Sequence, residues 1–195
     1  HPHLVAAQSL RDLTRIGLLG SELHRRITSG STGSADIAHQ LSHMTRTAGT
    51  ALSDIVWAVD PERDTAAMLV LHARTYAERT LADTGITAVL HFDHEGPDRP
   101  LDPSVKRDIF LVMKEAINNA IKHASASRIE VVLNTGPNSF DLKVIDNGKG
   151  FEPSARVDGN GVKNLHKRAQ RIGALLEIKS DPQSGTCIHL SGPLG

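Results

Sequence analysis

Apolar side chains recur at helical spacing along the first third of the chain. One stripe runs through residues 10–27, a polar turn of glycine, serine and threonine covers residues 28–34, and a second stripe runs through residues 37–59. The second stripe repeats every three or four residues, close to the heptad seam of a coiled coil. The pattern predicts an antiparallel helical hairpin over residues 1–62. A hairpin cannot bury so long a seam alone, so we expect it to dimerise into a four-helix bundle rather than to pack on the rest of the chain.

Residues 63–195 alternate between helical and strand-like patterns. Helical patterns cover residues 65–83, a segment that opens at Asp102-Pro103, and a segment that ends before Gly173, which suits a left-handed terminator. The predicted fold class is α+β, in which the hairpin is followed by a two-layer α/β sandwich with a mostly antiparallel sheet and helices on one face. The two predicted domains are residues 1–62 and 63–195. The strand-like segments are residues 86–92, 128–134, 140–145, 174–179 and 186–190.

Composition narrows the function classes. The 195 residues contain 22 Lys plus Arg and 22 Asp plus Glu, so no basic excess favours a nucleic-acid partner. The single cysteine, Cys187, excludes a disulfide framework and indicates a reducing compartment, so we expect a cytoplasmic protein. No apolar run has the length of a membrane span and no signal peptide is visible. A membrane would therefore be reached only through further parts of a longer parent protein, such as a sensory domain before residue 1.

The helix that opens at Asp102 carries candidate chemistry on one face. Glu115, Asn119 and Lys122 are spaced four and three residues apart, so an α-helix places them together, opposite its apolar stripe. A carboxylate, an amide oxygen and an ammonium can hold a hydrated Mg²⁺ and its phosphates, because Mg²⁺ prefers oxygen ligands and keeps several waters. The alternative is a solvated helix face with an ion pair, which is the commoner meaning of such a pattern in isolation.

A glycine-rich loop follows the strand-like segment 140–145. Residues 146–151 read Asp-Asn-Gly-Lys-Gly-Phe, and the glycines let a ligand approach the backbone closely. The aspartate before such a loop can accept a hydrogen bond from an exocyclic amine such as adenine N6. Asn-Gly is also a strong hairpin signal, but a polar stretch with Pro153 follows instead of a second strand. The order of residues therefore favours a mobile loop.

A second glycine motif, Gly159-Asn160-Gly161, opens the last predicted helix. A helix N-terminus preceded by glycines offers free N–H groups to phosphate. Basic side chains follow at residues 163, 167 and 168. The motif matches neither the Walker A nor the Rossmann pattern, so its meaning depends on the two motifs before it.

Together these segments resemble the N box (residues 114–124) and the G1 and G2 boxes of the Bergerat-type ATPase superfamily. The residues of these boxes look most like those of sensor histidine kinases of the NarX and DesK type. The resemblance is specific over about residues 85–193 and looser over residues 10–84, whose hairpin is similar to the family's dimerisation and phosphotransfer domain. It implies an ATP- and Mg²⁺-dependent protein-histidine kinase of a two-component system. Such a kinase works as a homodimer and passes phosphate to the receiver domain of a response regulator.

The resemblance also implies roles for single residues. Glu115 would be the catalytic acidic residue that orients or activates the reacting group, and Asn119 would be the Mg²⁺ ligand. The lid over ATP, residues 147–161, has few apolar anchors, so we expect it to be mobile without nucleotide and ordered around the phosphates. The other ATP-binding residues would lie near adenine (Asp146, Thr186), lie near phosphate (Lys122, His123) or shape the lid (Gly148, Gly150, Gly159, Gly161).

The phosphoacceptor departs from the family pattern. An alignment on residues 7–10 places His3 at that position, but Leu4 replaces the acidic neighbour that would act as base. An alignment on residues 13–16 places Ala6 there, and a terminal histidine without a role is the plainer interpretation of His3. An ATP-binding pseudokinase or scaffold is therefore one alternative. An anti-sigma-type serine kinase, disfavoured by the long hairpin, and a non-enzymatic coiled-coil module are the others.

Overall fold

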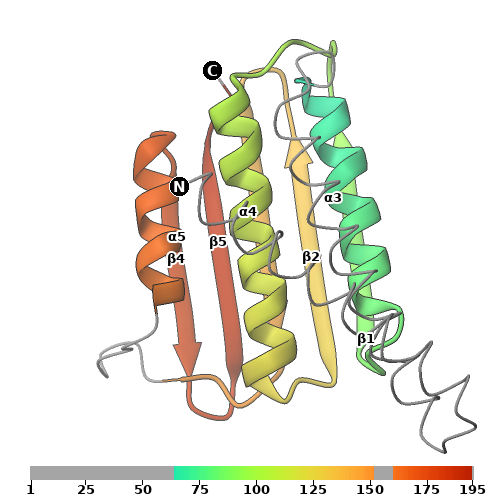
Figure 1. Cartoon of the computed structure of the whole chain (residues 1–195), viewed down its shortest axis with the longest axis vertical. Helices are drawn as coiled ribbons and strands as arrows, with labels where there is room; N and C mark the ends of the chain where they lie inside the picture. The colour runs from blue at the N-terminus through green and yellow to red at the C-terminus, as the bar shows by residue number, and fades with distance from the viewer. Residues whose placement is uncertain (1–63, 152–159, 195) are drawn as a thin grey trace, which may run out of the picture. The chain divides into compact units, whose positions relative to one another are not determined.

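The computed structural model describes residues 64–151 and 160–194. The predicted hairpin over residues 1–62, with its candidate phosphoacceptor His3, lies outside the described residues, as does Gly159 of the predicted lid. The described residues form two layers, a sheet and a set of helices that cover one of its faces (Figure 1). Among these residues, no helix is both long and apolar enough to span a bilayer.

The sheet has five strands in the order β1-β2-β3-β5-β4. The pairs β2–β3, β3–β5 and β4–β5 are antiparallel, and β1 pairs with β2 in parallel. The parallel pair arises because the helix α4 (Pro103–Asn119) and the π-helix η2 (Ala120–Ala124) form the crossover between β1 and β2. The prediction of a mostly antiparallel sheet with helices on one face is confirmed for the described residues. The strands are β1 (Thr87–His94), β2 (Arg128–Thr135), β3 (Ser139–Asp146), β4 (Leu175–Asp181) and β5 (Gly185–Pro193).

Local signals place the helix ends where the sequence predicts them. Helix α3 (Ala66–Leu81) follows Thr65, whose hydroxyl accepts a hydrogen bond from the N–H of Met68. Helix α4 (Pro103–Asn119) starts with proline after the cap Asp102, whose carboxylate accepts a hydrogen bond from the N–H of Ser104 at 2.7 Å. Helix α5 (Asn160–Arg171) is followed by Gly173 at φ +63°, the predicted left-handed terminator.

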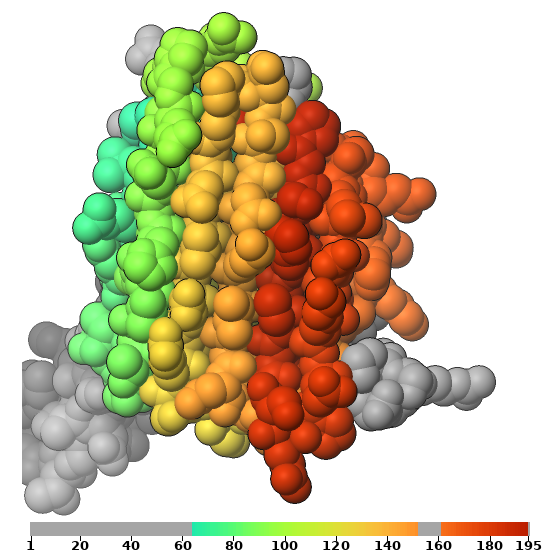
Figure 2. Space-filling view, turned by 180° about the vertical axis from the view of Figure 1, so that it is seen from behind, coloured from blue at the N-terminus to red at the C-terminus, as the bar shows by residue number. Residues whose placement is uncertain are grey.

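The core lies between the helices and the inner face of the sheet. Strands β2 and β3 alternate, so that Ile129, Val131 and Leu133 on β2 and Leu142 on β3 are buried under the helices. Helix α4 is the central helix of the layer, as Figure 1 shows, and Ile109 in its apolar stripe is fully buried. Figure 2 shows the other face of the sheet, where the strands lie side by side without a described helix over them.

Two buried charges hold α4 to its neighbours. The ammonium of Lys106 is fully buried and pairs with the carboxylate of Asp64, just before α3. The fully buried carboxylate of Asp108 accepts hydrogen bonds from Arg168 and Arg171 on α5. Buried charges need partners of this kind, because an unpaired one is costly. These pairs therefore fix the positions of α4 and α5, the two helices that border the candidate site.

Candidate functional site

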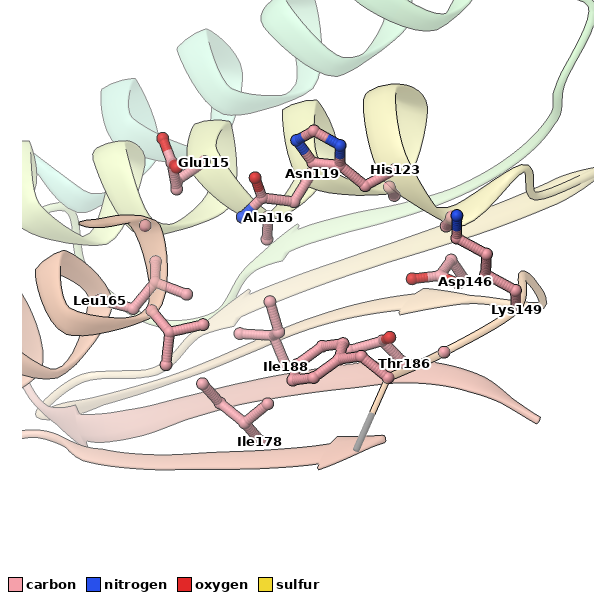
Figure 3. A pocket seen from close by; sticks show the side chains of 16 residues that line it. Glu115, Ala116, Asn119, His123, Asp146, Lys149, Leu165, Ile178, Thr186 and Ile188 are labelled. Atoms are coloured by element: carbon pink, nitrogen blue, oxygen red, sulfur yellow. The ribbon is translucent and has the colours of Figure 1, made fainter. Parts of the chain in front are cut away.

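A cavity of about 460 Å³ lies between α4, the loop after β3, the start of α5 and the inner face of the sheet. Figure 3 shows Asp146, Lys149 and Thr186 at one end of the cavity and Glu115 and Leu165 toward the other. Its lining residues are Glu115, Ala116, Asn119, Ala120, His123, Ala124, Asp146, Lys149, Gly150, Phe151, Gly161, Val162, Leu165, Ile178, Thr186 and Ile188. The three sequence motifs, far apart in the chain, thus contribute to one cavity.

Glu115, Asn119 and His123 provide the helix side of the cavity. Helical spacing predicts Lys122 on this face, but the structure differs: Lys122 is exposed and does not line the cavity. The reason is the direction of the cavity, which is also lined by Ala116 and Ala120 and therefore faces a side of the helix away from Lys122. His123 follows Asn119 by four residues and so shares that side of the helix; it lies within η2 (Ala120–Ala124), a π-helical turn at the end of α4. Such turns are frequent at functional sites.

Asp146 and Thr186 provide the sheet side, where they are register partners on β3 and β5. Asp146 is the last residue of β3 and is 8% exposed. One of its carboxylate oxygens, Oδ1, accepts a hydrogen bond of 2.9 Å from the N–H of Gly148. The Thr186 hydroxyl lies 3.0 Å from the hydroxyl of Ser180 on β4. Both groups are therefore held by neighbours while they border the cavity.

The loop after β3 is not a hairpin turn. The N–H of Lys149 donates to the carbonyl of Ala124 at 2.8 Å, and the carbonyl of Lys149 accepts from the N–H of Gln183 at 2.7 Å. The loop thus joins the end of η2 to the turn between β4 and β5. A Cβ on Gly148 would lie 2.3 Å from the carbonyl oxygen of Ala124, so only glycine fits. Gly148 serves close packing on protein backbone and does not line the cavity, whereas Gly150 does.

Asn147 fastens the start of the same loop. Its Oδ1 accepts hydrogen bonds from the N–H groups of Ser127 at 3.0 Å and Arg128 at 2.8 Å. Its Nδ2 donates to the Ser127 hydroxyl at 2.9 Å. This side chain therefore connects the residue next to Asp146 with the segment that leaves η2.

The start of α5 brings the second glycine motif against the helix motif. A Cβ on Gly161 would lie 2.9 Å from Oε1 of Glu115 and 3.6 Å from Nδ2 of Asn119. Further along α5, Arg168 and Arg171 bind the buried Asp108 of α4. The hydrogen bond to Asp108 raises the pKa of Arg171 above its ordinary value. The carboxylate and amide of the helix motif therefore lie directly beside the first turn of α5.

Several lining residues were not predicted from the sequence as site residues. Ile178 and Ile188 form part of the apolar floor, and their only signal is the strand alternation that marks any buried position. Val162 and Leu165 come from the first turns of α5. Lys149 is exposed at the rim and supplies an ammonium to the cavity, which the sequence assigned to Lys122 instead.

Residues 104–195 match the family described as histidine kinase-, DNA gyrase B- and HSP90-like ATPase. These residues, somewhat less than half of the chain, are similar to this ATPase family. The three motifs and the cavity that they share all lie within the matched residues.

Two sensor proteins are similar to about half of this chain. Sensor protein VraS of Staphylococcus aureus is 34% identical over 102 residues, which are 52% of this chain and 29% of that protein. Sensor protein VraS of Staphylococcus epidermidis has the same identity and coverage. The predicted relationship to sensor histidine kinases is thereby confirmed. The chain spans less than a third of the length of these relatives.

Solved structures with the same fold include two histidine kinases. The histidine kinase domain of the Erythrobacter litoralis EL346 blue-light activated histidine kinase matches with a TM-score of 0.52 at 16% identity, covering 97% of this chain and 94% of that one. The Acinetobacter baumannii histidine kinase AdeS matches with a TM-score of 0.53 at 15% identity, covering 95% and 97%. At such identities these likenesses establish the fold alone.

Proposed function

We propose that this chain is the ATP-dependent catalytic part of a sensor histidine kinase. In this proposal it transfers the γ-phosphoryl group of ATP to a histidine, from which an aspartate of a response regulator receives it. The single observation that carries the proposal is the shared cavity of the ATPase domain, which gathers Glu115 and Asn119 with Asp146 and Thr186. The relationship to sensor proteins selects a histidine kinase among the activities of this ATPase family.

The two ends of the cavity suit the two ends of a nucleotide. Asp146 and Thr186 would bind the exocyclic amine of adenine, since the carboxylate is held in place by the N–H of Gly148. The apolar side chains of Ile178 and Ile188 would contact the faces of the base. Glu115 and Asn119, beside the start of α5, would lie at the phosphates.

The residues at the phosphate end fit a Mg²⁺ ion bound together with its nucleotide. Among the described residues no group of three or more His, Cys, Asp or Glu side chains could form a metal cage. Mg²⁺ commonly takes one or two protein oxygens and completes its shell with water and phosphate, so the amide oxygen of Asn119 and the nearby carboxylate of Glu115 suffice. The bound ion would neutralise phosphate charge.

The chain's own side chains would then act mainly by positioning. His123 borders the cavity and would bind phosphate oxygens, whereas Lys149 lies beside Asp146 at the adenine end. The carboxylate of Glu115 would orient the attacking imidazole and accept its proton. Phosphoryl transfer depends on positioning and on charge stabilisation, so this division of roles is sufficient.

The remaining assignments follow from the same proposal. Residues 1–62 would form the dimerisation and phosphotransfer hairpin, and residues 63–195 the ATP-binding domain, in a homodimer that docks a receiver domain. The chain would work in the cytoplasm, with any membrane attachment in other parts of a longer protein. His3 is the candidate phosphoacceptor. Because Leu4 stands in place of the family's acidic neighbour, an ATP-binding scaffold without a phosphoacceptor is the second candidate function.

Binding and transfer are tested separately. Calorimetric titration of the whole chain with ATP and Mg²⁺ should show saturable binding, and Asp146→Asn should weaken it. Asp141→Asn is the matched control, because Asp141 lies on the same strand with its side chain on the opposite face of the sheet. Incubation with γ-labelled ATP should then give a protein label that is stable in base and labile in acid. Binding without any label would favour the scaffold, and no binding would refute the proposal.

A further inference from the structure

Ser180, near the end of β4, holds three groups around the base end of the cavity. Its side chain is buried, at 6% exposure, and does not itself line the cavity. Its Oγ accepts a hydrogen bond of 2.8 Å from the N–H of Phe151. The same oxygen lies 3.2 Å from the carbonyl oxygen of Gly185 and 3.0 Å from the hydroxyl of Thr186. Ser180 and Thr186 are register partners, and Thr186 is in turn the partner of Asp146.

Counting protons fixes the direction of each bond. A serine hydroxyl has one proton to donate and two lone pairs that accept. The carbonyl oxygen of Gly185 can only accept, so it takes the Ser180 proton. The lone pairs of Ser180 then receive the N–H of Phe151 and the hydroxyl proton of Thr186. With its proton directed at Ser180, the Thr186 hydroxyl presents only lone pairs to the cavity.

This polarity has a consequence for base recognition. Asp146 beside Thr186 presents a carboxylate oxygen, which also only accepts when ionised. Two neighbouring acceptors suit an amino group, which donates two N–H bonds. A carbonyl oxygen at the same place on the base would face two acceptors and leave all of them unpaired, which strongly disfavours a ligand.

We propose that Ser180 is a positioning residue that sets the base specificity of this site by holding the Thr186 hydroxyl as an acceptor. The inference rests on the proposed nucleotide function and adds a determinant outside the cavity wall. When Ser180 is replaced by alanine, the Thr186 hydroxyl loses its acceptor and becomes free to turn its proton toward a 6-oxo base. Preference for a 6-amino purine should then fall, while the Asp146 carboxylate stays in place.

The test compares ATP with inosine triphosphate, whose base carries a 6-oxo group. Affinities of the whole chain for both, each with Mg²⁺, give a discrimination ratio. We expect Ser180→Ala to lower this ratio about three- to tenfold, the range of one hydrogen bond. Ser180→Thr keeps the hydroxyl, so its discrimination ratio should equal that of the unmodified chain. Ser191→Ala is the matched control, since Ser191 lies on the outer face of β5 toward its other end and should leave the ratio unchanged.

A double-mutant cycle shows whether Ser180 acts through Thr186. Thr186→Val should lower the ratio as Ser180→Ala does, and the double variant should fall no further than Thr186→Val alone. If Ser180→Ala does not fold, as thermal unfolding would reveal, the near-isosteric Ser180→Cys takes its place with the same expectation. An unchanged ratio in the Ser180 variant, or independent effects in the cycle, would overturn the inference. Absence of ATP binding by the unmodified chain would instead refute the proposed function from which the inference starts.

Discussion

Replacing the buried Asp108 by asparagine should loosen α5 and weaken the nucleotide site from a distance. The Asp108 side chain is 0% exposed and accepts hydrogen bonds from Nη1 of Arg168 at 3.1 Å, from Nε of Arg171 at 2.5 Å, and from Nη2 of Arg171. Asparagine has nearly the same shape but no charge, and its amide would direct N–H groups at the arginines. At least one charge-assisted hydrogen bond is lost, and an amide N–H of the asparagine then faces N–H groups of the arginines.

The magnitude follows from these contacts. A hydrogen bond to a charged group contributes about 1.5–3 kcal/mol, and breaking a fully buried pair costs about 3–5 kcal/mol. The side chains of Arg168 and Arg171 are 29% and 50% exposed, so water can replace part of what they lose. We therefore expect Asp108→Asn to lower the free energy of unfolding by about 2–3 kcal/mol.

Two measurements check this expectation. Urea unfolding of the variant and of the unmodified chain gives the loss of stability. Asp141→Asn is the control, because that carboxylate also pairs with basic side chains but lies partly exposed on the face of the sheet that no described helix covers, so its loss should cost less than about 1 kcal/mol. ATP affinity should also fall in Asp108→Asn, since α5 carries Gly161 against Glu115. A loss of stability no larger than that of the control would refute the reasoning.

The other predictions concern the cavity, the hairpin and the outer face. Asp146→Asn should weaken ATP binding by about 1.5–3 kcal/mol in calorimetry through the loss of a charge-assisted bond, and an unchanged affinity would remove Asp146 from the site. Leu41→Asp should dissociate the proposed homodimer by placing a charge in the apolar seam, and light scattering that finds the unmodified chain monomeric at micromolar concentration would contradict that proposal. Burial raises the pKa of Asp141, but hydrogen bonds from His189 and Lys143 outweigh it and hold this pKa below its ordinary value. A carboxyl whose pKa is lowered by folding stabilises the fold above its unfolded pKa of about 4. The stability difference between the unmodified chain and Asp141→Asn should therefore vanish as pH falls through the folded pKa of Asp141. A stability difference that persists at lower pH would exclude this cause.

Short-range signals in the sequence were sufficient for the elements and for most of the cavity. Asp102 and Pro103 mark the start of α4, and Gly173 marks the end of α5, because caps and terminators act within one turn of the chain. The strands differ from their predicted limits by a few residues, as β5 shows: it runs from Gly185 to Pro193 whereas alternation marked only residues 186–190. The glycine motifs led to the cavity through resemblance, since their spacing alone allowed a hairpin turn.

Short-range signals in the sequence do not predict contacts between residues that are far apart in the chain. Asp108 and Arg171 are 63 positions apart, and nothing near either one indicates that the carboxylate is buried under the other's guanidinium. The hydrogen bonds that Oδ1 of Asn147 accepts from the N–H groups of Ser127 and Arg128 could not be predicted either, because the sequence shows only an Asn-Gly pair typical of a turn. Long-range partners depend on how the sheet brings distant segments together, and that information is not local.

Lys122 is the site residue whose position helical periodicity predicts wrongly. Helical spacing groups Lys122 with Glu115 and Asn119, but the cavity faces the other edge of this group, where His123 follows Asn119 by four residues. The π-turn η2 ends at Ala124, and Ser125 then adopts φ 53°, so the chain leaves the helix in a left-handed residue. That ending lets the carbonyl of Ala124 accept the N–H of Lys149, which anchors the glycine loop. The cavity is therefore lined by His123 and not by Lys122, and the loop anchored on Ala124 brings Lys149 to the edge of the cavity beside Asp146.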